Sequence, residues 1–316
     1  MKRLLILSAL LCATASTAGA DDLVKVAIGQ RGNWDTAVMH LGDKAGIFKK
    51  HGITQELLYT SGGGETQQAV LSGSVDIGAA AGIMGVLSAY SKGAPVRILG
   101  AQATGAADFW YAKTDSGIAK LQDTDGKTLA YSTNGSSTHS IVLAFIKEFG
   151  LKAKPTATGN PSATLTAVMS GQVDVGWASP PFGFKQLEDN AIRIVAKAND
   201  APLVRGQTIR LLITNTDTLA KRKDVLARFM NAYRETVDYM YSGNPQVMKD
   251  YAEFVGVSET VAKRVRDEFF PKSLLDPDEI KGLDVIIPEA VTLKYTAVPL
   301  TKEQLGELIQ IPQRKK

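Results

Sequence analysis

The chain contains almost no cysteine. Cys12 is the only one among its 316 residues, and it lies in a short apolar stretch near the N-terminus. Downstream of that stretch, disulfide bonds and thiolate catalysis are both excluded, so stability must come from the hydrophobic core. Leu11 precedes Cys12 where a lipid-attachment site requires a small residue, which argues against lipidation.

The chain also has few histidines, and its positive and negative charges nearly balance. Basic residues exceed acidic ones by four, or by two once Lys2 and Arg3 are set aside. So small an excess argues against nucleic acid or an anionic membrane surface as a partner. His40 and His51 have no partner at metal-ligand spacing, and there is no Walker pattern for nucleotide phosphate. The sequence therefore predicts no metal and no cofactor, and it shows no His/carboxylate cluster at catalytic spacing.

The apolar run Leu4–Leu11 is too short to anchor the chain in a membrane. It follows the charged pair Lys2-Arg3 and precedes the small residues Ala18-Gly19-Ala20. This order is typical of a secretory signal peptide, so residues 1–20 are predicted to direct export and to lie outside the fold. The remaining length suits two lobes of roughly 100–150 residues each, and the 44% hydrophobic and 22% charged content is ordinary for a globular protein.

One segment of the sequence occurs twice. Thr66–Ala80 and Thr164–Ala178 share an apolar helical pattern, a Ser-Gly stop and an apolar strand with the motif V-D-[IV]-G. Loops of small residues then follow at residues 78–82 and 176–180. Helix, glycine stop and buried strand are typical of an open parallel sheet, which binds ligands beyond the carboxyl ends of its strands. Two lobes built alike predict a cleft between them.

The loop of residues 29–34 follows the first predicted strand and leads into Asp35-Thr36, which we expect to cap a helix. Asn33 and Trp34 stand at this strand-to-helix junction. Trp34 is interpreted as a ligand contact because it lies in a polar loop, although an aromatic residue of the core is the ordinary alternative.

Gly135-Ser136-Ser137-Thr138 is the strongest chemical signal in the chain. A glycine lets the backbone approach a ligand, and the hydroxyls and free amides of the following helix start are suited to an oxyanion such as a sulfonate, carboxylate or nitrate. An ordinary Ser/Thr helix cap would need only one of these hydroxyls. His139 could face the ligand or the helix surface.

Trp177 lies near the end of the second copy of the repeat, and the rigid pair Pro180-Pro181 follows that copy. The chain is expected to cross between lobes near residues 115–125 and to return near residues 207–214. Arg205 and Arg210 lie near the return. Each could balance an anionic ligand or form a structural ion pair. The C-terminal third is predicted to be helical, with a capping box at Thr301.

Residues 45–53 (AGIFKKHGI), the two copies of the repeat, and Gly135–Thr138 before an apolar helix resemble the periplasmic substrate-binding proteins of ABC importers for sulfonates, taurine and nitrate. The same superfamily includes thiamine-pyrimidine-synthase-like proteins. The resemblance implies an α/β, type II periplasmic binding protein fold with two lobes, a hinge and an interlobe cleft. It implies lobe I at residues 21–112, lobe II at 113–206, and a return to lobe I at 207–316. The ligand contacts that it implies are Asn33, Trp34, Ala80, Gly82, Asp108, Ser136, Ser137, Thr138, Ser162 and Trp177.

The same resemblance implies hinge closure over a small organic anion, a periplasmic location, a monomeric protein and an ABC permease as partner. Two other functions stay open. The chain could be an enzyme of the same fold, of the pyrimidine-synthase or menaquinone-pathway kind, or a sensor module that presents its ligand to a receptor.

Overall fold

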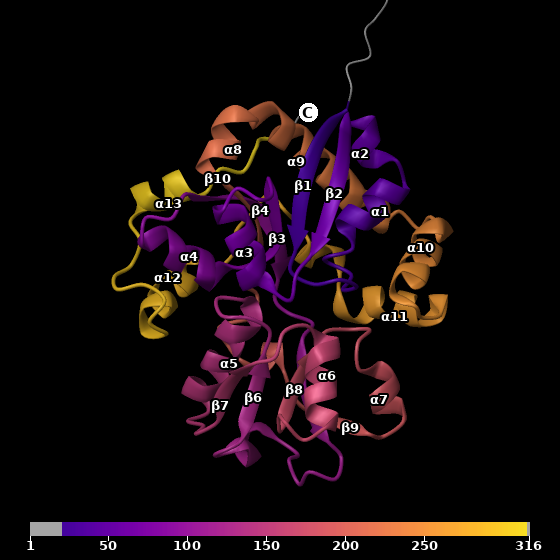
Figure 1. The fold of residues 1–316 in the computed structure, drawn as a ribbon, viewed down its shortest axis with the longest axis vertical. Coiled ribbons are helices and arrows are strands. Elements are labelled where there is room, and N and C mark those ends of the chain that lie inside the picture. Colours follow the sequence, from indigo (N-terminus) through magenta and orange to yellow (C-terminus); the bar gives the residue numbers. More distant parts are fainter. Residues whose placement is uncertain (1–20, 315–316) are drawn as a thin grey trace, which may run out of the picture.

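The computed structural model describes residues 21–314, so the predicted signal peptide lies outside the described residues. The chain forms two lobes stacked along the long axis of the molecule (Figure 1). Within residues 21–314, no helix combines the length and apolar character needed to cross a membrane.

Lobe I contains a five-stranded sheet in the order β2-β1-β3-β10-β4. β1 pairs in parallel with β2 and β3, whereas β10 runs antiparallel to β3 and β4. The strands are β1 (Asp22–Ile28), β2 (Ile53–Tyr59), β3 (Ile77–Gly82), β4 (Val96–Thr104) and β10 (Thr208–Asn215).

Lobe II repeats this plan in the order β7-β6-β8-β5-β9. β6 pairs in parallel with β7 and β8, and β5 runs antiparallel to β8 and β9. The two copies of the sequence repeat thus become equivalent helix–strand units, α3–β3 and α6–β8. The strands are β5 (Phe109–Lys113), β6 (Thr128–Tyr131), β7 (Lys154–Ala157), β8 (Val175–Ala178) and β9 (Ile192–Lys197).

Helices cover both sheets, and those of the C-terminal third surround lobe I (Figure 1). Lobe I carries α1 (Val38–Lys44), α2 (Ile47–Lys50), α3 (Gly63–Leu71) and α4 (Ile83–Ser91). Lobe II carries η1 (Leu121–Thr124), α5 (Ser137–Glu148), α6 (Pro161–Met169) and α7 (Phe184–Glu188), with η2 (Ala198–Asp200) at its end. The C-terminal third contains α8 (Thr216–Lys221), α9 (Lys223–Met240), α10 (Pro245–Val255), α11 (Glu259–Phe269), η3 (Lys272–Leu274), α12 (Leu283–Thr292) and α13 (Lys302–Leu308). The predicted capping box at Thr301 is confirmed at the start of α13.

The small-residue stretch 78–82, predicted as a loop, is instead most of β3, and all of it is buried. Close packing explains the composition. A Cβ on Gly78 would lie 2.8 Å from Val70 and 2.9 Å from Thr66, both on α3. Only very small side chains let this helix lie directly against the central strand.

Two neighbouring segments connect the lobes. The chain leaves lobe I after β4 and returns before β10, and the Gly105 N–H donates to the Gln207 carbonyl at 2.7 Å where the segments meet. The sequence-based boundary at residue 112 differs from the sheet assignment, because Phe109–Lys113 is a strand of lobe II. The reason is packing: the Trp110 indole donates to the Ala130 carbonyl at 2.8 Å and packs edge-on against Phe145.

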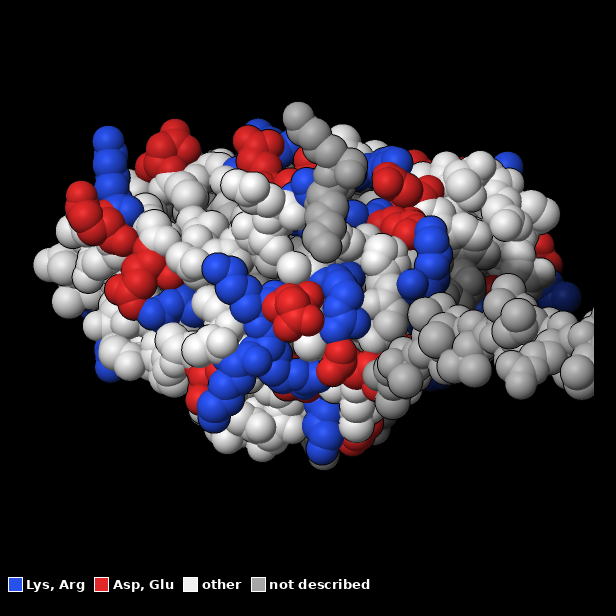
Figure 2. Space-filling model, turned by 90° about the horizontal axis from the view of Figure 1, so that it is seen from above, with Lys and Arg blue, Asp and Glu red and all other residues white. Residues whose placement is uncertain are grey.

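Basic and acidic side chains are intermingled on the end of lobe I that is seen from above (Figure 2). At the N-terminal ends of β3 and β1, Arg222 pairs with Asp76 at 2.7 Å and Arg228 pairs with Asp22. This mixture agrees with the small net charge of the sequence and leaves these two arginines balanced by carboxylates.

Candidate functional site

The lobes meet through glycine backbones. A Cβ built on Gly82 would lie 2.6 Å from the Gly135 carbonyl oxygen, and one on Gly85 would lie only 2.2 Å from it. Nearby, the Gly64 N–H donates to Thr133 Oγ1 across the cleft at 3.0 Å. Larger residues at Gly82 or Gly85 would hold the lobes apart, because the opposing atoms belong to the backbone and cannot rotate away.

A small cavity lies between the lobes beside this contact, near the carboxyl ends of the parallel strands. Its volume is about 10 Å³, which is close to the space of one water molecule. Lobe I contributes Gly29, Gln30, Gly63, Ala80 and Arg210, and lobe II contributes Ser132, Ser136, Ser137, Thr138 and Trp177. We call this the inner cavity.

Two hydrogen-bond donors on the wall of the inner cavity have no partner among the described residues: Trp177 Nε1 and Gln30 Nε2. Both side chains are buried. The Asn33 amide explains the position of Gln30, since its Nδ2 donates to Gln30 Oε1 and leaves Nε2 free. Buried donors without partners are unfavourable, so a ligand with acceptor atoms would compensate for them.

The backbone of Ala80 is strained on this same wall. Its φ of 64° lies in the left-handed region, which a residue with a Cβ rarely adopts. Ala80 is the bulged residue of β3, because the pairing with β10 passes from Ala79 directly to Ala81. Its N–H donates to Gln102 Oε1 rather than to the β10 ladder. Strain of this kind concentrates at functional sites, where the surrounding structure holds it in place.

Arg210 lies at the base of the cleft in a buried cluster with two carboxylates. Its guanidinium donates to Asp35 at 2.8 Å through Nη1 and to both Asp108 oxygens at 2.6 and 2.8 Å through Nη2. Its Nε reaches across the cleft to Ser137 Oγ at 3.2 Å. Arg210 thus forms the structural ion pair that the sequence left open, and it also lines the inner cavity.

The charge state of this cluster follows from burial. Burial alone would lower the pKa of Arg210, but Asp108 and Asp35 outweigh it and raise the pKa, so the guanidinium stays charged. Burial also raises the pKa of Asp108, against the opposing effect of Arg210. Two carboxylates around one guanidinium leave no net positive charge at the base of the cleft when both are ionised. Ligand acceptors there would therefore be recognised by directed donors more than by excess charge.

Asp35 does not cap α1 as predicted. The N-cap residue is Ala37, without a side-chain bond, and the Asp35 carboxylate turns instead to Arg210. A buried guanidinium without a carboxylate partner is strongly destabilising, whereas losing a helix cap costs only about 1 kcal/mol, and this explains the difference.

The hydroxyls at the start of α5 divide their roles. Ser136 Oγ is the N-cap and accepts the His139 N–H at 3.2 Å. Ser137 Oγ accepts the bond from Arg210, and Thr138 Oγ1 accepts the Ser132 N–H at 2.9 Å. The ordinary helix cap and a lining of the cavity therefore occur together, since all three residues also line the inner cavity.

The remaining predicted contacts lie in other places. Trp34 is in the core of lobe I, where Nε1 donates to the Tyr241 hydroxyl at 2.9 Å and the ring packs edge-on against Tyr251. Asp108 lies behind Arg210, and Gly82 is part of the lobe-to-lobe contact. Ser162 lines a separate cavity at the mouth of the cleft.

His139 does not line the inner cavity, and its side chain is half-buried. Its ring stacks on Tyr131 at 4.3 Å, and its Nδ1 lies 3.1 Å from the Tyr295 hydroxyl of the C-terminal segment. Burial lowers the pKa of His139 to about 4, so the ring is neutral near pH 7. Within residues 21–314, no group of three His, Cys, Asp or Glu side chains could hold a metal ion.

Sequence reasoning missed Gly29, Gln30, Gly63 and Ser132, which also line the inner cavity. Their signal was positional: each lies just beyond a strand or at a helix start, within the loops where an open parallel sheet binds ligands.

The chain matches the profile of the NMT1/THI5-like family over residues 33–246. A relative from Saccharomyces cerevisiae, 4-amino-5-hydroxymethyl-2-methylpyrimidine phosphate synthase THI5, is 23% identical over 241 residues, 70% of this chain and 69% of the yeast protein.

Three solved structures share the fold. The alkanesulfonate-binding protein SsuA from Xanthomonas axonopodis pv. citri, bound to MOPS, has a TM-score of 0.75 at 17% identity and covers 92% of this chain and 99% of that one. The aliphatic sulphonate binding protein SsuA from Escherichia coli has a TM-score of 0.69 at 18% identity and covers 93% of this chain and 94% of that one. The nitrate-binding protein NrtA from Synechocystis PCC 6803 has a TM-score of 0.70 at 12% identity and covers 92% of this chain and 86% of that one. The predicted periplasmic binding protein fold is thereby confirmed.

Proposed function

Because the chain belongs to the NMT1/THI5-like family and has the periplasmic binding protein fold, we propose that it is the solute-binding component of an ABC importer. It captures a small organic anion between its lobes and delivers it to a membrane permease. A sulfonate or carboxylate is the expected ligand, with nitrate as a smaller alternative. Export by the signal peptide would place it in the periplasm.

The observation that carries this proposal is the lining of the inner cavity. Among the described residues, Trp177 and Gln30 offer donors without partners, and no His, Cys, Asp, Glu or Lys lines the cavity. Donors favour a ligand rich in acceptor oxygens. A wall without a proton-transferring side chain favours binding over chemical conversion.

Placement between two matched lobes supports hinge closure. Arg210 Nε bonds to Ser137 Oγ across the cleft, so a contact exists that only the closed arrangement makes. The inner cavity has the space of about one water molecule, so it would receive an acceptor oxygen at one end of the solute. An oxygen held by Gln30 on one side and Trp177 on the other would add to the contact and shift the population towards the closed form. The sulfonate and nitrate binders among the structural neighbours make oxyanions the first compounds to test.

The second candidate is a pyrimidine-forming enzyme, favoured by the yeast relatives. The two functions differ in the fate of the bound compound. A binding protein returns its solute unchanged, whereas an enzyme releases a different molecule.

The test is a panel of alkanesulfonates, carboxylates and nitrate, scored by melting temperature and tryptophan fluorescence. A ligand at a hundred times its Kd should stabilise the fold by about 2.7 kcal/mol. Of the three tryptophans, Trp177 alone has an indole without a hydrogen-bond partner among the described residues, so we expect it to report binding. Mass spectrometry of the recovered ligand then separates binding from turnover. If no anion changes either signal, the proposal is wrong.

A further inference from the structure

A larger cavity opens at the mouth of the cleft. Its lining residue Arg31 directly follows Gln30, which lines the inner cavity. We call this larger cavity the outer pocket. Its volume is about 310 Å³, within the roughly 300–1,000 Å³ typical of ligand pockets. Both lobes form its walls: Arg31, Tyr59 and Ser61 come from lobe I, and Asn160, Ser162 and Phe182 come from lobe II.

The guanidinium of Arg31 is held in place by aromatic rings. Its Cζ lies 4.3 Å from the ring centre of Phe254 and 5.9 Å from that of Tyr59. Phe254 is itself stacked on His40 at 3.9 Å. Burial, followed by the charges of Lys44 and Arg31, lowers the pKa of His40, so the stack carries one positive charge at neutral pH. Ring stacking orients the guanidinium without using any of its N–H donors.

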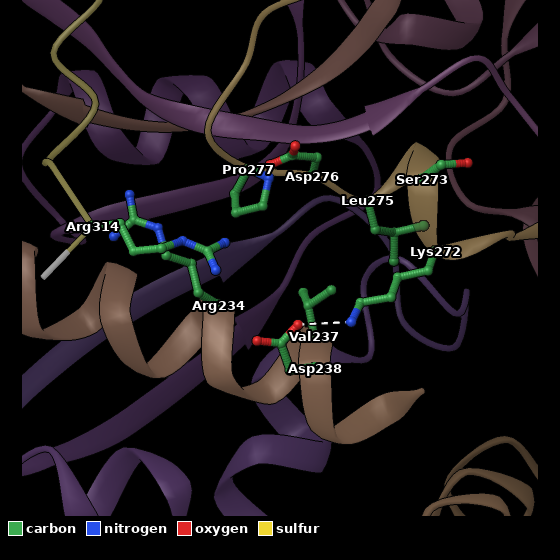
Figure 3. Close-up of a pocket in the computed structure, with 9 residues that line it drawn as sticks. All are labelled: Arg234, Val237, Asp238, Lys272, Ser273, Leu275, Asp276, Pro277 and Arg314. Carbon is green, nitrogen blue, oxygen red and sulfur yellow. Dashed lines mark ion pairs between the residues drawn. The ribbon is translucent and has the colours of Figure 1, made fainter. Parts of the chain in front are cut away.

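Arg31 forms no ion pair and no hydrogen bond with any residue between positions 21 and 314. This distinguishes the outer pocket from a cavity of similar size on lobe I, between α9 and the segment 272–277 (Figure 3). There, Lys272 faces Asp238 at 2.8 Å and Arg234 pairs with Asp278 at 2.6 Å. The cations of that cavity are balanced, whereas five guanidinium donors of Arg31 stay available.

The wall of lobe II also favours a negative group. α6 begins here, with Asn160 as its N-cap accepting the Ala163 N–H at 3.0 Å. The positive end of this helix dipole therefore faces the pocket, together with the Ser162 hydroxyl, for which no hydrogen-bond partner exists in the described part of the chain. Within residues 21–314, Arg31 is the one charged residue that lines the pocket, and no carboxylate is among the lining residues.

Contact between the lobes fixes the two walls of the outer pocket relative to each other. A Cβ built on Gly32 would lie 3.2 Å from the ring of Phe182, so the loop after β1 lies directly against lobe II. An anion in the outer pocket would thus touch Arg31 on one lobe and the start of α6 on the other, and would stabilise closure.

We propose that the outer pocket binds an acidic group at the outward end of the solute. The preferred ligand is then elongated, with acceptor oxygens at its inner end and a second anionic group that reaches Arg31. This inference rests on the proposed function, because it extends the same ligand from the inner cavity to the mouth of the cleft.

The test compares matched pairs of probes at constant ionic strength: ethane-, propane- and butanesulfonate, each against the disulfonate of the same chain. Titration calorimetry measures both affinities on the wild-type protein and on the Arg31→Gln and Arg31→Lys variants. Arg97→Gln is the matched control, because Arg97 also lies over an aromatic ring, Tyr90, at 5.7 Å but lines neither cavity of the cleft.

We expect at least one disulfonate to bind the wild-type protein roughly tenfold more tightly than its monosulfonate. Arg31→Gln should abolish this preference and leave monosulfonate affinity unchanged, Arg31→Lys should retain part of it, and Arg97→Gln should retain all of it. Monosulfonate binding without a disulfonate preference, or a preference that survives Arg31→Gln, would overturn the inference alone. Failure of all six probes to bind would overturn both it and the anion-binding function.

Discussion

Replacing Gly85 with alanine should separate closure of the lobes from the stability of each lobe. Gly85 lies inside α4, where alanine is favoured over glycine by about 1 kcal/mol. Across the cleft, however, the new methyl group would lie 2.2 Å from the Gly135 carbonyl oxygen. Ordinary contact begins near 3.4 Å, so the lobes must part by about 1.2 Å at this point.

That separation affects the contacts that hold the closed form. The bond from Arg210 Nε to Ser137 Oγ is already 3.2 Å long and would be lost. Losing a hydrogen bond from a charged donor costs about 1.5–3 kcal/mol, and residual overlap adds to this. We therefore expect ligand affinity to fall roughly a hundredfold, while the ligand-free melting temperature stays equal or rises slightly.

Calorimetry with the tightest sulfonate of the panel measures the affinity, and small-angle scattering at saturating ligand measures compactness. Gly306→Ala is the control, because it adds the same methyl group to a helix at a point where no atom of the described residues lies within 4 Å of it. Wild-type affinity and compactness in Gly85→Ala would refute the view that this glycine contact belongs to the ligand-bound form.

Three further outcomes are expected. Trp177→Phe should remove most of the fluorescence response and weaken binding roughly tenfold, as measured by titration, because the free indole N–H is lost; an unchanged response would assign it to another tryptophan. Arg210→Met should lower the free energy of unfolding in urea by about 3–5 kcal/mol, since Asp35 and Asp108 stay buried without a partner; a loss below about 1 kcal/mol would contradict this. For His139, the folded pKa of about 4 lies below the ordinary 6.5, so the unfolded state binds more protons between these values. Stability should therefore fall by up to about 3 kcal/mol as the pH drops from 6.5 to 4, and His139→Phe should flatten this slope relative to the wild type in urea titrations; parallel slopes would show that the ring titrates normally.

Local patterns predicted the architecture well. The repeated helix, Ser-Gly stop and strand appear as α3–β3 and α6–β8 in two sheets with the same strand order. These features depend on periodicity and glycine stops, which act within a few residues. The stretch 78–82 forms a strand instead of the predicted loop: small residues are typical of loops, whereas here they let α3 lie on the central strand.

Side-chain roles in the cleft were harder to predict, because they depend on residues far apart in sequence. Trp34 and Trp177 look alike in sequence, since each lies beside a polar or proline-rich loop. In the structure, Tyr241 takes the indole N–H of Trp34, and nothing described takes that of Trp177. Trp34 is therefore a buried aromatic residue of the core, which was the ordinary alternative for it.

The sequence by itself determined that the chain forms two α/β lobes of repeated design with loops of small and hydroxyl residues at the strand ends, because hydrophobic period and turn residues are local properties. Only the tertiary structure decided which residues face the cleft. Gly85 meets Gly135 and Arg210 meets Asp35, Asp108 and Ser137 across long separations in the chain. Packing and charge pairing between distant segments are settled when the lobes come together, and no spacing along the chain encodes them.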